Sequence, residues 1–330
     1  MEFRWLGRTG IKVSSLVLGT MPFGAEADET ESAAMFRAAR DHGVNVFDCA
    51  DVYAGGRAEE ILGRLIKDVR EEVVITSKAY FQAGPDVNAM GASRRHLLLS
   101  VEKSLRRLAT ERIDVYFVHR FDERTPLDET LRALDDLVRQ GKILYTGASN
   151  FAAWQVEKAL GVAAKAGCTP FHVIQPMYSL VKRQAEVEIL PMARAESLGV
   201  MTYSPLAGGL LSGKYGVGRK PETGRILTHK ISQVRYGEAW NYEVAERFTA
   251  FARSRGLDPV ALAVAWVGSH PAVTAPIVGA RNVEQLRLSL AASDLKMTAE
   301  LRAEVSALSP EPPPATDRNE ERTGTNFGVR

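Results

Sequence analysis

Four side chains of the kinds that move protons stand at or just after the ends of short apolar segments. They are Asp48, Tyr53, Lys78 and His119. If these segments are neighbouring buried strands, their carboxyl ends meet at one edge of a sheet, where catalytic groups of α/β proteins collect. The four side chains are therefore expected to converge.

Their chemistry suits proton transfer to a carbonyl oxygen. A lysine ammonium beside a phenol favours the phenolate and lowers the tyrosine pKa from about 10. A carboxylate next to that lysine keeps it charged and fixed, and a histidine at the same edge can hydrogen-bond a substrate oxygen. Together they can protonate an oxygen while a hydride reaches the adjoining carbon. Each alone is more commonly structural, so the prediction rests on their convergence.

Eight strand-like segments, mostly separated by helical patterns, must position these groups. They are residues 16–19, 44–47, 73–75, 113–118, 143–145, 172–174, 200–203 and 273–278. Alternating strands and helices predict a parallel sheet, because parallel strands need crossover connections. Eight units favour a (β/α)8 TIM barrel within one α/β domain over residues 1–330, with a doubly wound open sheet as the competing layout.

One helical pattern is especially clear. Leu127, Leu131, Leu134 and Val138 fall on one face of a predicted helix that follows a Thr-Pro pair, and Asp128 is its expected capping residue.

Three stretches exceed what a barrel of about 250 residues needs. Residues 3–13 contain two glycines and predict an N-terminal hairpin. Residues 205–240 are rich in Lys and Arg and too long for an ordinary connection, which favours a functional loop. Residues 309–330 begin with a proline-rich run and predict an extended C-terminal tail.

Composition narrows the class of protein. The 330 residues are 45% hydrophobic and 25% charged with a net charge of +2, which argues against nucleic acid or a membrane as the main partner. No apolar run approaches the roughly 20 residues that span a bilayer. Cys49 and Cys168 form neither a disulfide framework nor a metal set. We expect a cytoplasmic protein without a metal, and a homo-oligomer is possible.

Beyond these groups, the sequence resembles the aldo-keto reductases from about Leu6 to Leu308. Within this family, it looks most like the bacterial oxidoreductase branch that is related to potassium-channel β subunits. Its motifs are Gly19-Thr20-Met21, Phe47-Asp48-x4-Tyr53-x5-Ala58-Glu59-x2-Leu62-Gly63, Val74-Ile75-Thr76-Ser77-Lys78, Asp114-Val115-Tyr116-Phe117-Val118-His119, Gly147-Ala148-Ser149-Asn150, Gln175-Pro176-x-Tyr178-Ser179, Tyr203-Ser204-Pro205-Leu206-Ala207-Gly208 and Val278-Gly279-Ala280-Arg281-x3-Gln285-Leu286.

The resemblance implies an NADP(H)-dependent reductase of small carbonyl or sugar substrates, in a barrel without a Rossmann fold. Tyr53 would be the general acid, Lys78 and Asp48 would tune it, and His119 would orient the carbonyl.

The resemblance also implies a set of cofactor contacts. Within it, Ser149, Asn150 and Gln175 would hold the nicotinamide carboxamide and Tyr203 would stack on its ring. A capping role for Asn150, at the helix that starts near residue 151, is the alternative. The full set is Gly19, Thr20, Met21, Asp48, Ser149, Asn150, Gln175, Tyr203, Ser204, Pro205, Leu206, Gly208 and Lys214, with Gly279, Arg281 and Gln285 at the adenosine end.

The substrate mouth is expected to be aromatic with one arginine, which suits a hydroxylated or anionic carbonyl compound. A solvated surface role for Arg120 is equally compatible. The expected lining residues are Met21, Phe23, Tyr53, Tyr80, Phe81, His119 and Arg120.

One departure from the family pattern concerns adenine. The family usually has a Glu-Asn pair shortly after Gln285, whereas this chain has Leu288 and Ser289. A carboxylate and an amide are thereby lost, which bears on adenine binding and on the choice between NADP and NAD.

Two other classes of function compete with the reductase. A cofactor-binding regulatory subunit with a membrane partner would resemble the channel β subunits. A metal-dependent hydrolase or lyase using Asp48 and His119 is poorly supported, because the sequence offers no further carboxylate or histidine cluster nearby.

Overall fold

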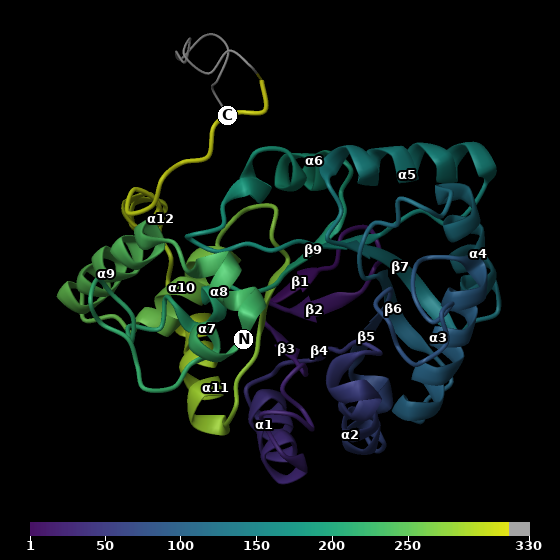
Figure 1. The fold of residues 1–330 in the computed structure, drawn as a ribbon, viewed down its shortest axis with the longest axis horizontal. Helices are drawn as coiled ribbons and strands as arrows, with labels where there is room; N and C mark the ends of the chain where they lie inside the picture. The colour runs from purple at the N-terminus through teal and green to yellow at the C-terminus, as the bar shows by residue number, and fades with distance from the viewer. Residues whose placement is uncertain (317–330) are drawn as a thin grey trace.

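Eight parallel strands close into a barrel in the computed structural model, which describes residues 1–316 (Figure 1). Their order around the ring is β10-β3-β4-β5-β6-β7-β8-β9. The (β/α)8 TIM barrel is therefore confirmed, and the open sheet is excluded. The strands are β3 (Val17–Gly19), β4 (Val46–Asp48), β5 (Val74–Ala79), β6 (Ile113–Val118), β7 (Ile143–Ser149), β8 (Val173–Gln175), β9 (Gly199–Thr202) and β10 (Ala275–Val278).

The strands are short and apolar because both of their faces are covered. Every residue of β5 and β6 is buried, as expected where one face lines the barrel interior and the other meets helices. The register sets Asp48 of β4 opposite Thr76 of β5, and Lys78 of β5 opposite Phe117 of β6. The carboxyl ends of these three strands therefore reach the same end of the barrel.

A ring of helices surrounds the strands (Figure 1). A large outer core fills the space between the helices and the barrel, with Phe47 and Ile61 among its fully buried members. The helices are α1 (Glu29–Asp41), α2 (Arg57–Ile66), α3 (Arg94–Leu108), α4 (Leu127–Arg139), α5 (Ala153–Ala166), α6 (Ile189–Ala195), α7 (Arg225–Thr228), α8 (Lys230–Tyr236), α9 (Ala239–Ser254), α10 (Pro259–Gly268), α11 (Val283–Leu290) and α12 (Ala299–Ser306). None of the helices within residues 1–316 combines the length and apolar character needed to traverse a bilayer.

The predicted helix α4 forms, but its start differs from the expectation. Leu131 and Leu134 are fully buried, as the spacing predicted. Pro126 occupies the N-cap position without a side-chain hydrogen bond, and Asp128 lies inside the first turn. The expected capping role of Asp128 is therefore wrong, and its carboxylate can act only on the positive end of the helix dipole.

The N-terminal hairpin plugs the amino end of the barrel. Strands β1 (Phe3–Trp5) and β2 (Lys12–Ser14) pair antiparallel, as predicted. Leu6 and Val13 are fully buried in the interior cluster that also contains Val46 and Val74, the first residues of β4 and β5. The other end of the barrel is left for the functional groups.

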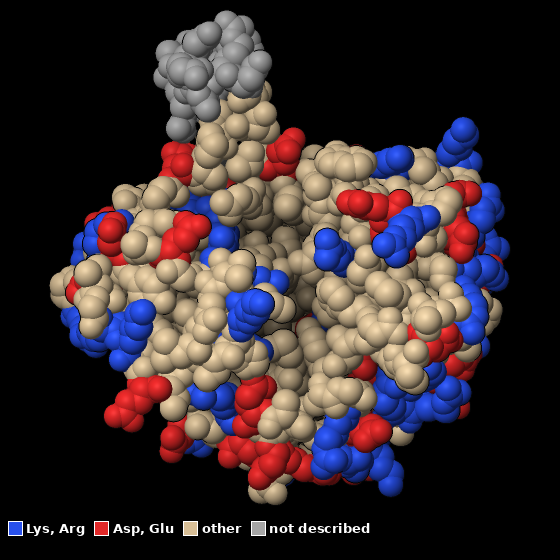
Figure 2. Space-filling view, in the orientation of Figure 1, with Lys and Arg blue, Asp and Glu red and all other residues tan. Residues whose placement is uncertain are grey.

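The long basic segment after β9 is partly helical. It contains the turn η4 (Ala207–Gly209) and the helices α7 and α8. In the space-filling view the molecule is hollowed at its centre, with Lys and Arg side chains on both sides of the hollow (Figure 2). In the same orientation, α7 and α8 lie beside this hollow (Figure 1).

The C-terminal tail is described only in part. Residues 309–316 form neither helix nor strand and lead away from the helical ring (Figure 1). The remainder of the predicted tail, residues 317–330, lies outside the described residues.

A glycine on β7 provides a test of how tightly the barrel is packed. A Cβ on Gly147 would collide with the fully buried Phe117 ring and lie 2.9 Å from the Val173 carbonyl oxygen. We expect Gly147→Ala to lower the free energy of unfolding by about 1–3 kcal/mol or more, because neither neighbour can retreat. Chemical denaturation measures this change.

The matched control is Gly161→Ala in the interior of α5, where a Cβ would meet nothing within 4 Å. That substitution should be neutral or stabilise by about 0.5–1 kcal/mol, the usual helix gain over glycine. Equal effects at the two positions would contradict the tight packing at Gly147.

Candidate active site

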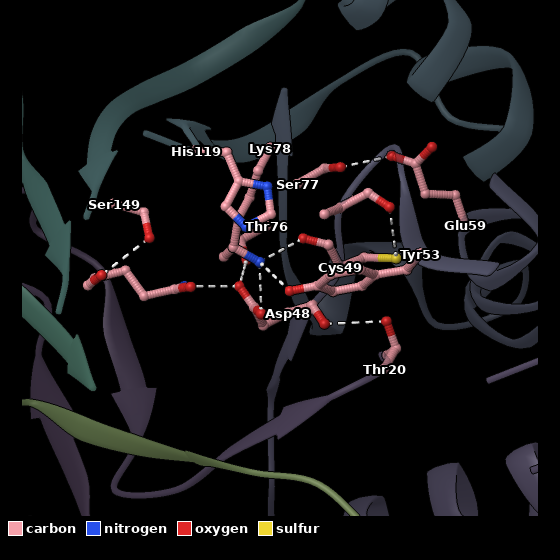
Figure 3. Close-up of polar contacts among 12 residues, drawn as sticks. Thr20, Asp48, Cys49, Tyr53, Glu59, Thr76, Ser77, Lys78, His119 and Ser149 are labelled. Atoms are coloured by element: carbon pink, nitrogen blue, oxygen red, sulfur yellow. Dashed lines mark hydrogen bonds and ion pairs between the residues drawn. The ribbon is translucent and has the colours of Figure 1, made fainter. Parts of the chain in front are cut away.

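A fully buried lysine lies at the centre of the four predicted catalytic residues (Figure 3). Lys78 Nζ donates to Asp48 Oδ2 and to the Cys49 carbonyl oxygen, each at 2.7 Å, and to the Tyr53 hydroxyl oxygen at 3.4 Å. All three ammonium hydrogens therefore have acceptors, which offsets the cost of burying the charge.

The carboxylate of Asp48 is fixed by further donors. Its Oδ1 accepts hydrogen bonds from Thr76 Oγ1 at 2.6 Å and from Gln175 Nε2 at 2.8 Å (Figure 3). Thr76 and Lys78 are two residues apart on β5, so their side chains lie on the same face. We assigned no role to Thr76 from the sequence, although that spacing was the available signal.

The protonation states of Lys78 and Tyr53 follow from this geometry. Burial disfavours the ammonium of Lys78, but attraction to Asp48 raises its pKa above the ordinary value. For Tyr53, burial raises the pKa and the nearby Lys78 only opposes that rise. The expectation that the phenol pKa would lie below about 10 is therefore wrong: desolvation outweighs the lysine, and the phenol is protonated at neutral pH.

His119 is neutral at this site. Burial and the charge of Lys78 hold its pKa well below the ordinary value. Its ring packs edge-on against those of Tyr53 and Phe81, with centroid distances of 6.2 and 4.9 Å. Its Nδ1 is buried and has no hydrogen-bond partner within residues 1–316.

A second polar network lies behind the turn that carries Tyr53. Glu59 of α2 is fully buried. It accepts a hydrogen bond from the Ser77 hydroxyl at 2.5 Å and forms an ion pair with Arg107 at 2.6 Å. The turn η1 (Tyr53–Gly56) reaches α2 through Gly56 at φ +97°, where a Cβ would meet the Arg107 side chain. This network ties α2 and α3 to β5. We overlooked Glu59 in the sequence, although a glutamate among the buried apolar positions of α2 indicates a buried polar network.

The residues expected at the nicotinamide carboxamide also converge. Asn150 has φ +58°; its Nδ2 donates to the His119 carbonyl oxygen at 2.9 Å, and its Oδ1 accepts the Tyr203 hydroxyl at 2.6 Å. Ser149 Oγ donates to the Gln175 carbonyl oxygen at 3.0 Å. The helix α5 has Ala152 as its N-cap, so the alternative that Asn150 caps this helix is wrong.

The backbone after β9 contains several left-handed residues. Ser204, Ala207, Gly208 and Gly209 all have φ between +51° and +96°. The amides of Ala207 and Gly209 donate within these turns to the carbonyl oxygens of Ser204 and Leu206, at 2.9 and 3.0 Å. Lys214, farther along the segment, is exposed.

The adenosine-end residues surround the start of α11, with one correction. Asn282 is the N-cap of this helix and accepts from the Gln285 amide, so Arg281 precedes the helix and does not open it. The Gln285 side chain in turn accepts from the Arg281 amide at 3.3 Å. Gly279 and Arg281 are exposed, and Leu288 is 44% exposed.

A model of the Aldo/keto reductase family matches residues 15–310. The chain belongs to the aldo/keto reductase family. It is 38% identical to the uncharacterized oxidoreductase YrpG of Bacillus subtilis over 324 residues, covering 94% of this chain and 97% of the relative. The family resemblance predicted from the motifs is thereby confirmed.

Other relatives of this aldo/keto reductase family member have different names. A probable voltage-gated potassium channel subunit beta of Arabidopsis thaliana is 36% identical, covering 89% of this chain and 92% of the relative. The versiconal hemiacetal acetate reductase of Aspergillus parasiticus is 31% identical, covering 91% of this chain and 94% of the relative.

The rim of the aldo/keto reductase barrel carries most of the expected substrate residues. Phe81 is 39% exposed and touches the ring of Tyr80 as well as that of His119. Met21 is partly exposed, and its sulfur accepts a hydrogen bond from Arg225 of α7 at 3.5 Å. Arg120 is exposed.

Phe23 differs from the other expected rim residues. It is completely buried in the outer core, so it does not face the mouth. A second aromatic group was missed: Phe121 packs edge-on against Phe151 and Trp154, and Trp154 is 61% exposed. Phe121 and Phe151 lie outside helices and strands, whereas Trp154 is in the first turn of α5; scattered aromatic residues of this kind gave only a weak sequence signal.

Gly19 and Thr20, two of the expected cofactor residues, have structural roles in the barrel. A Cβ on Gly19 would lie 2.8 Å from the Ile277 side chain, which requires glycine there. Thr20 donates from its amide and its hydroxyl to the Asp48 carbonyl oxygen, at 2.8 and 3.0 Å. Within residues 1–316, no group of three or more His, Cys, Asp or Glu side chains could hold a metal ion.

Asp51 is a buried carboxyl group that the catalytic assignment does not use. It is 4% exposed, and neither carboxyl oxygen has a hydrogen-bond partner within residues 1–316. Burial, followed by the charge of Glu59, raises its pKa to about 7. An unpartnered carboxyl group in such a place is costly when ionised.

The pKa of Asp51 predicts how stability depends on pH. The unfolded carboxyl ionises near pH 4, whereas the folded one stays protonated up to about pH 7. Stability therefore falls as pH rises through this window and stays lowered above it. Asp51→Asn should raise the free energy of unfolding at pH 8 by on the order of 2–4 kcal/mol and change it little near pH 4.5.

Urea unfolding at both pH values measures the difference. The matched control is Asp86→Asn, since the exposed Asp86 has a pKa below its ordinary value. This control should bring no stabilisation at pH 8. A gain from Asp51→Asn that is the same at both pH values would contradict the raised pKa.

Proposed function

We propose that this protein is an NADP(H)-dependent reductase of aldehyde, ketone or sugar carbonyl groups, with Tyr53 as the general acid. The observation that supports this most strongly is the contact of a protonated phenol with a fully buried ammonium. Membership of the aldo/keto reductase family and the names of its oxidoreductase relatives support the same class of reaction.

The proposed acid–base step follows from the pKa shifts. Tyr53 holds its proton until a carbonyl oxygen gains negative charge, and then donates it from Oη to that oxygen. The phenolate left behind lies 3.4 Å from Lys78 Nζ, which stabilises it. The neutral His119 can donate a hydrogen bond to the same oxygen from Nε2. The phenolate then regains a proton from solvent.

The chemistry of the expected cofactor residues fits a nicotinamide dinucleotide. When bound, this cofactor supplies the hydride that reaches the carbonyl carbon. Ser149, Asn150 and Gln175 would face its carboxamide, and Tyr203 is held by Asn150 where it could stack on the ring. Ser204, Leu206, Gly208 and Lys214 would follow the pyrophosphate.

Substitution of the proposed acid tests the mechanism. Tyr53→Phe should lower kcat for NADPH-dependent carbonyl reduction by at least about 10²–10⁴-fold, because it removes the proton donor and keeps the ring. The dissociation constant for NADPH, measured by fluorescence quenching, should hardly change. Phe81→Leu is a control at the rim and should alter KM more than kcat. More than a tenth of wild-type turnover in Tyr53→Phe would mean that another group is the acid.

The preference for NADPH is expected to depend on Arg281. Its exposed guanidinium can grip the 2′-phosphate in a forked, charge-assisted contact. Arg281→Ala should weaken NADPH binding by about tenfold or more and leave NADH binding nearly unchanged. Calorimetric titration of both cofactors measures this.

The control for this experiment is Arg287→Ala, which removes an exposed arginine that lies within α11. It should change neither dissociation constant appreciably. If Arg281→Ala weakens both cofactors alike, the arginine serves the adenosine generally. If the wild type already prefers NADH, the proposed preference is wrong.

A regulatory subunit is the second candidate, because two plant relatives are named as probable channel β subunits. In that case cofactor occupancy, and not turnover, would be the output. Pull-down against membrane fractions with and without NADPH separates the two. A partner captured only with cofactor, together with no turnover on a panel of aldehydes, ketones and oxidised sugars, would favour the regulatory subunit.

A further inference from the structure

A pocket of about 140 Å³ lies away from the proposed cofactor and substrate residues. It runs along one face of α3 and is covered by the loop 83–89, with Asp51 in its wall. The four proposed catalytic residues and the proposed cofactor residues are not among those that line it. It is therefore a separate cavity, although Asp51 is two residues from Tyr53.

The wall of this pocket contains a carboxyl group that needs a donor. Asp51 is 4% exposed, and both of its oxygens are buried and lack a partner of ordinary hydrogen-bond geometry within residues 1–316, although the Val52 amide is close enough to lower the pKa of the carboxyl. The nearby Arg107 is only partly available as a donor to Asp51, because its Nε and Nη2 contact Glu59 at 2.7 and 2.6 Å. A buried acceptor that is left without a donor destabilises the folded state. A ligand with an O–H or N–H group would remove that cost.

The remaining polar groups of the pocket favour a negative ligand. Lys103 is exposed and makes no hydrogen bond or ion pair with the residues of 1–316, and Arg107 also lines the cavity. Arg95 does so as well, but it is within 3.4 Å of Asp86. His96, in the first turn of α3, has a lowered pKa because it is buried, so it adds no charge of its own. A metal ion or ammonium at Asp51 would have to lie close to the basic side chains.

We propose that this pocket binds a small oxyanion that carries its own proton, namely hydrogen phosphate or the end of a phosphate monoester. The phosphate hydroxyl would donate to Asp51, and the other oxygens would accept from Lys103 and Arg107. A group of this size fits in about 140 Å³. Above about pH 7, where the Asp51 carboxyl is ionised, the same geometry rejects sulfate, because a sulfate dianion has no proton to donate.

The comparison of phosphate with sulfate is therefore the test. Calorimetric titrations are made at pH 8, where Asp51 is ionised, and at constant ionic strength, on the full chain with saturating NADPH so that the nucleotide site is filled. Inorganic phosphate should bind with a dissociation constant at least about tenfold below that of sulfate. Methyl phosphate then shows whether the pocket admits an ester.

Three variants localise the binding. Lys103→Met should weaken phosphate by about tenfold, because it removes the uncommitted cation. Asp51→Asn keeps the cavity but gives the wall an N–H donor, so sulfate should approach phosphate in affinity. Arg281→Ala, at the proposed nucleotide site, should leave phosphate binding unchanged.

Two outcomes would overturn the proposal. One is the absence of saturable phosphate binding, which would leave Asp51 solvated by water alone. The other is phosphate binding that Arg281→Ala abolishes and Lys103→Met does not alter, which would place the anion at the nucleotide site. Neither outcome bears on Tyr53, so the reductase proposal is tested separately.

Discussion

The buried ion pair between Lys78 and Asp48 is the interaction on which the rest of the site depends. Bringing both charges out of water is expensive, and removing one partner of such a pair typically costs about 3–5 kcal/mol. The barrel compensates by supplying further hydrogen bonds to both charged groups. Thr76 and Gln175 donate to the carboxylate, and the Cys49 carbonyl oxygen accepts from the ammonium. Three strands, β4, β5 and β8, thus contribute side chains to one network, which the closed barrel keeps in register.

This network also explains why the tyrosine is a competent acid. An isolated buried phenol would give up its proton with great difficulty, and a solvated one would be positioned by nothing. Beside Lys78, Tyr53 stays protonated at rest and yet has a cation in place for the charged state. The second network, Glu59 with Ser77 and Arg107, holds the turn and the strand that carry these two groups. Positioning and electrostatics therefore come from separate sets of residues.

The sequence predicted the fold well because strand ends and helix periodicity are local signals. The convergence of Asp48, Tyr53, Lys78 and His119 followed from topology alone. Burial is a property of the whole molecule, and the errors concern burial and local backbone geometry. Phe23 is inside the core and not at the mouth, and the pKa of Tyr53 is raised by desolvation that no motif encodes.

The closed ring has a consequence for how the chain reaches its native state. Strand β3, near the start of the chain, must pair with β10, near its end, and the register joins Val17 to Ile277. Until that pairing forms, both border strands present unpaired backbone groups, which are templates for association with other chains. Such distant pairing is entropically slow to find. The chain must therefore have left the ribosome at least as far as β10 before these open edges disappear.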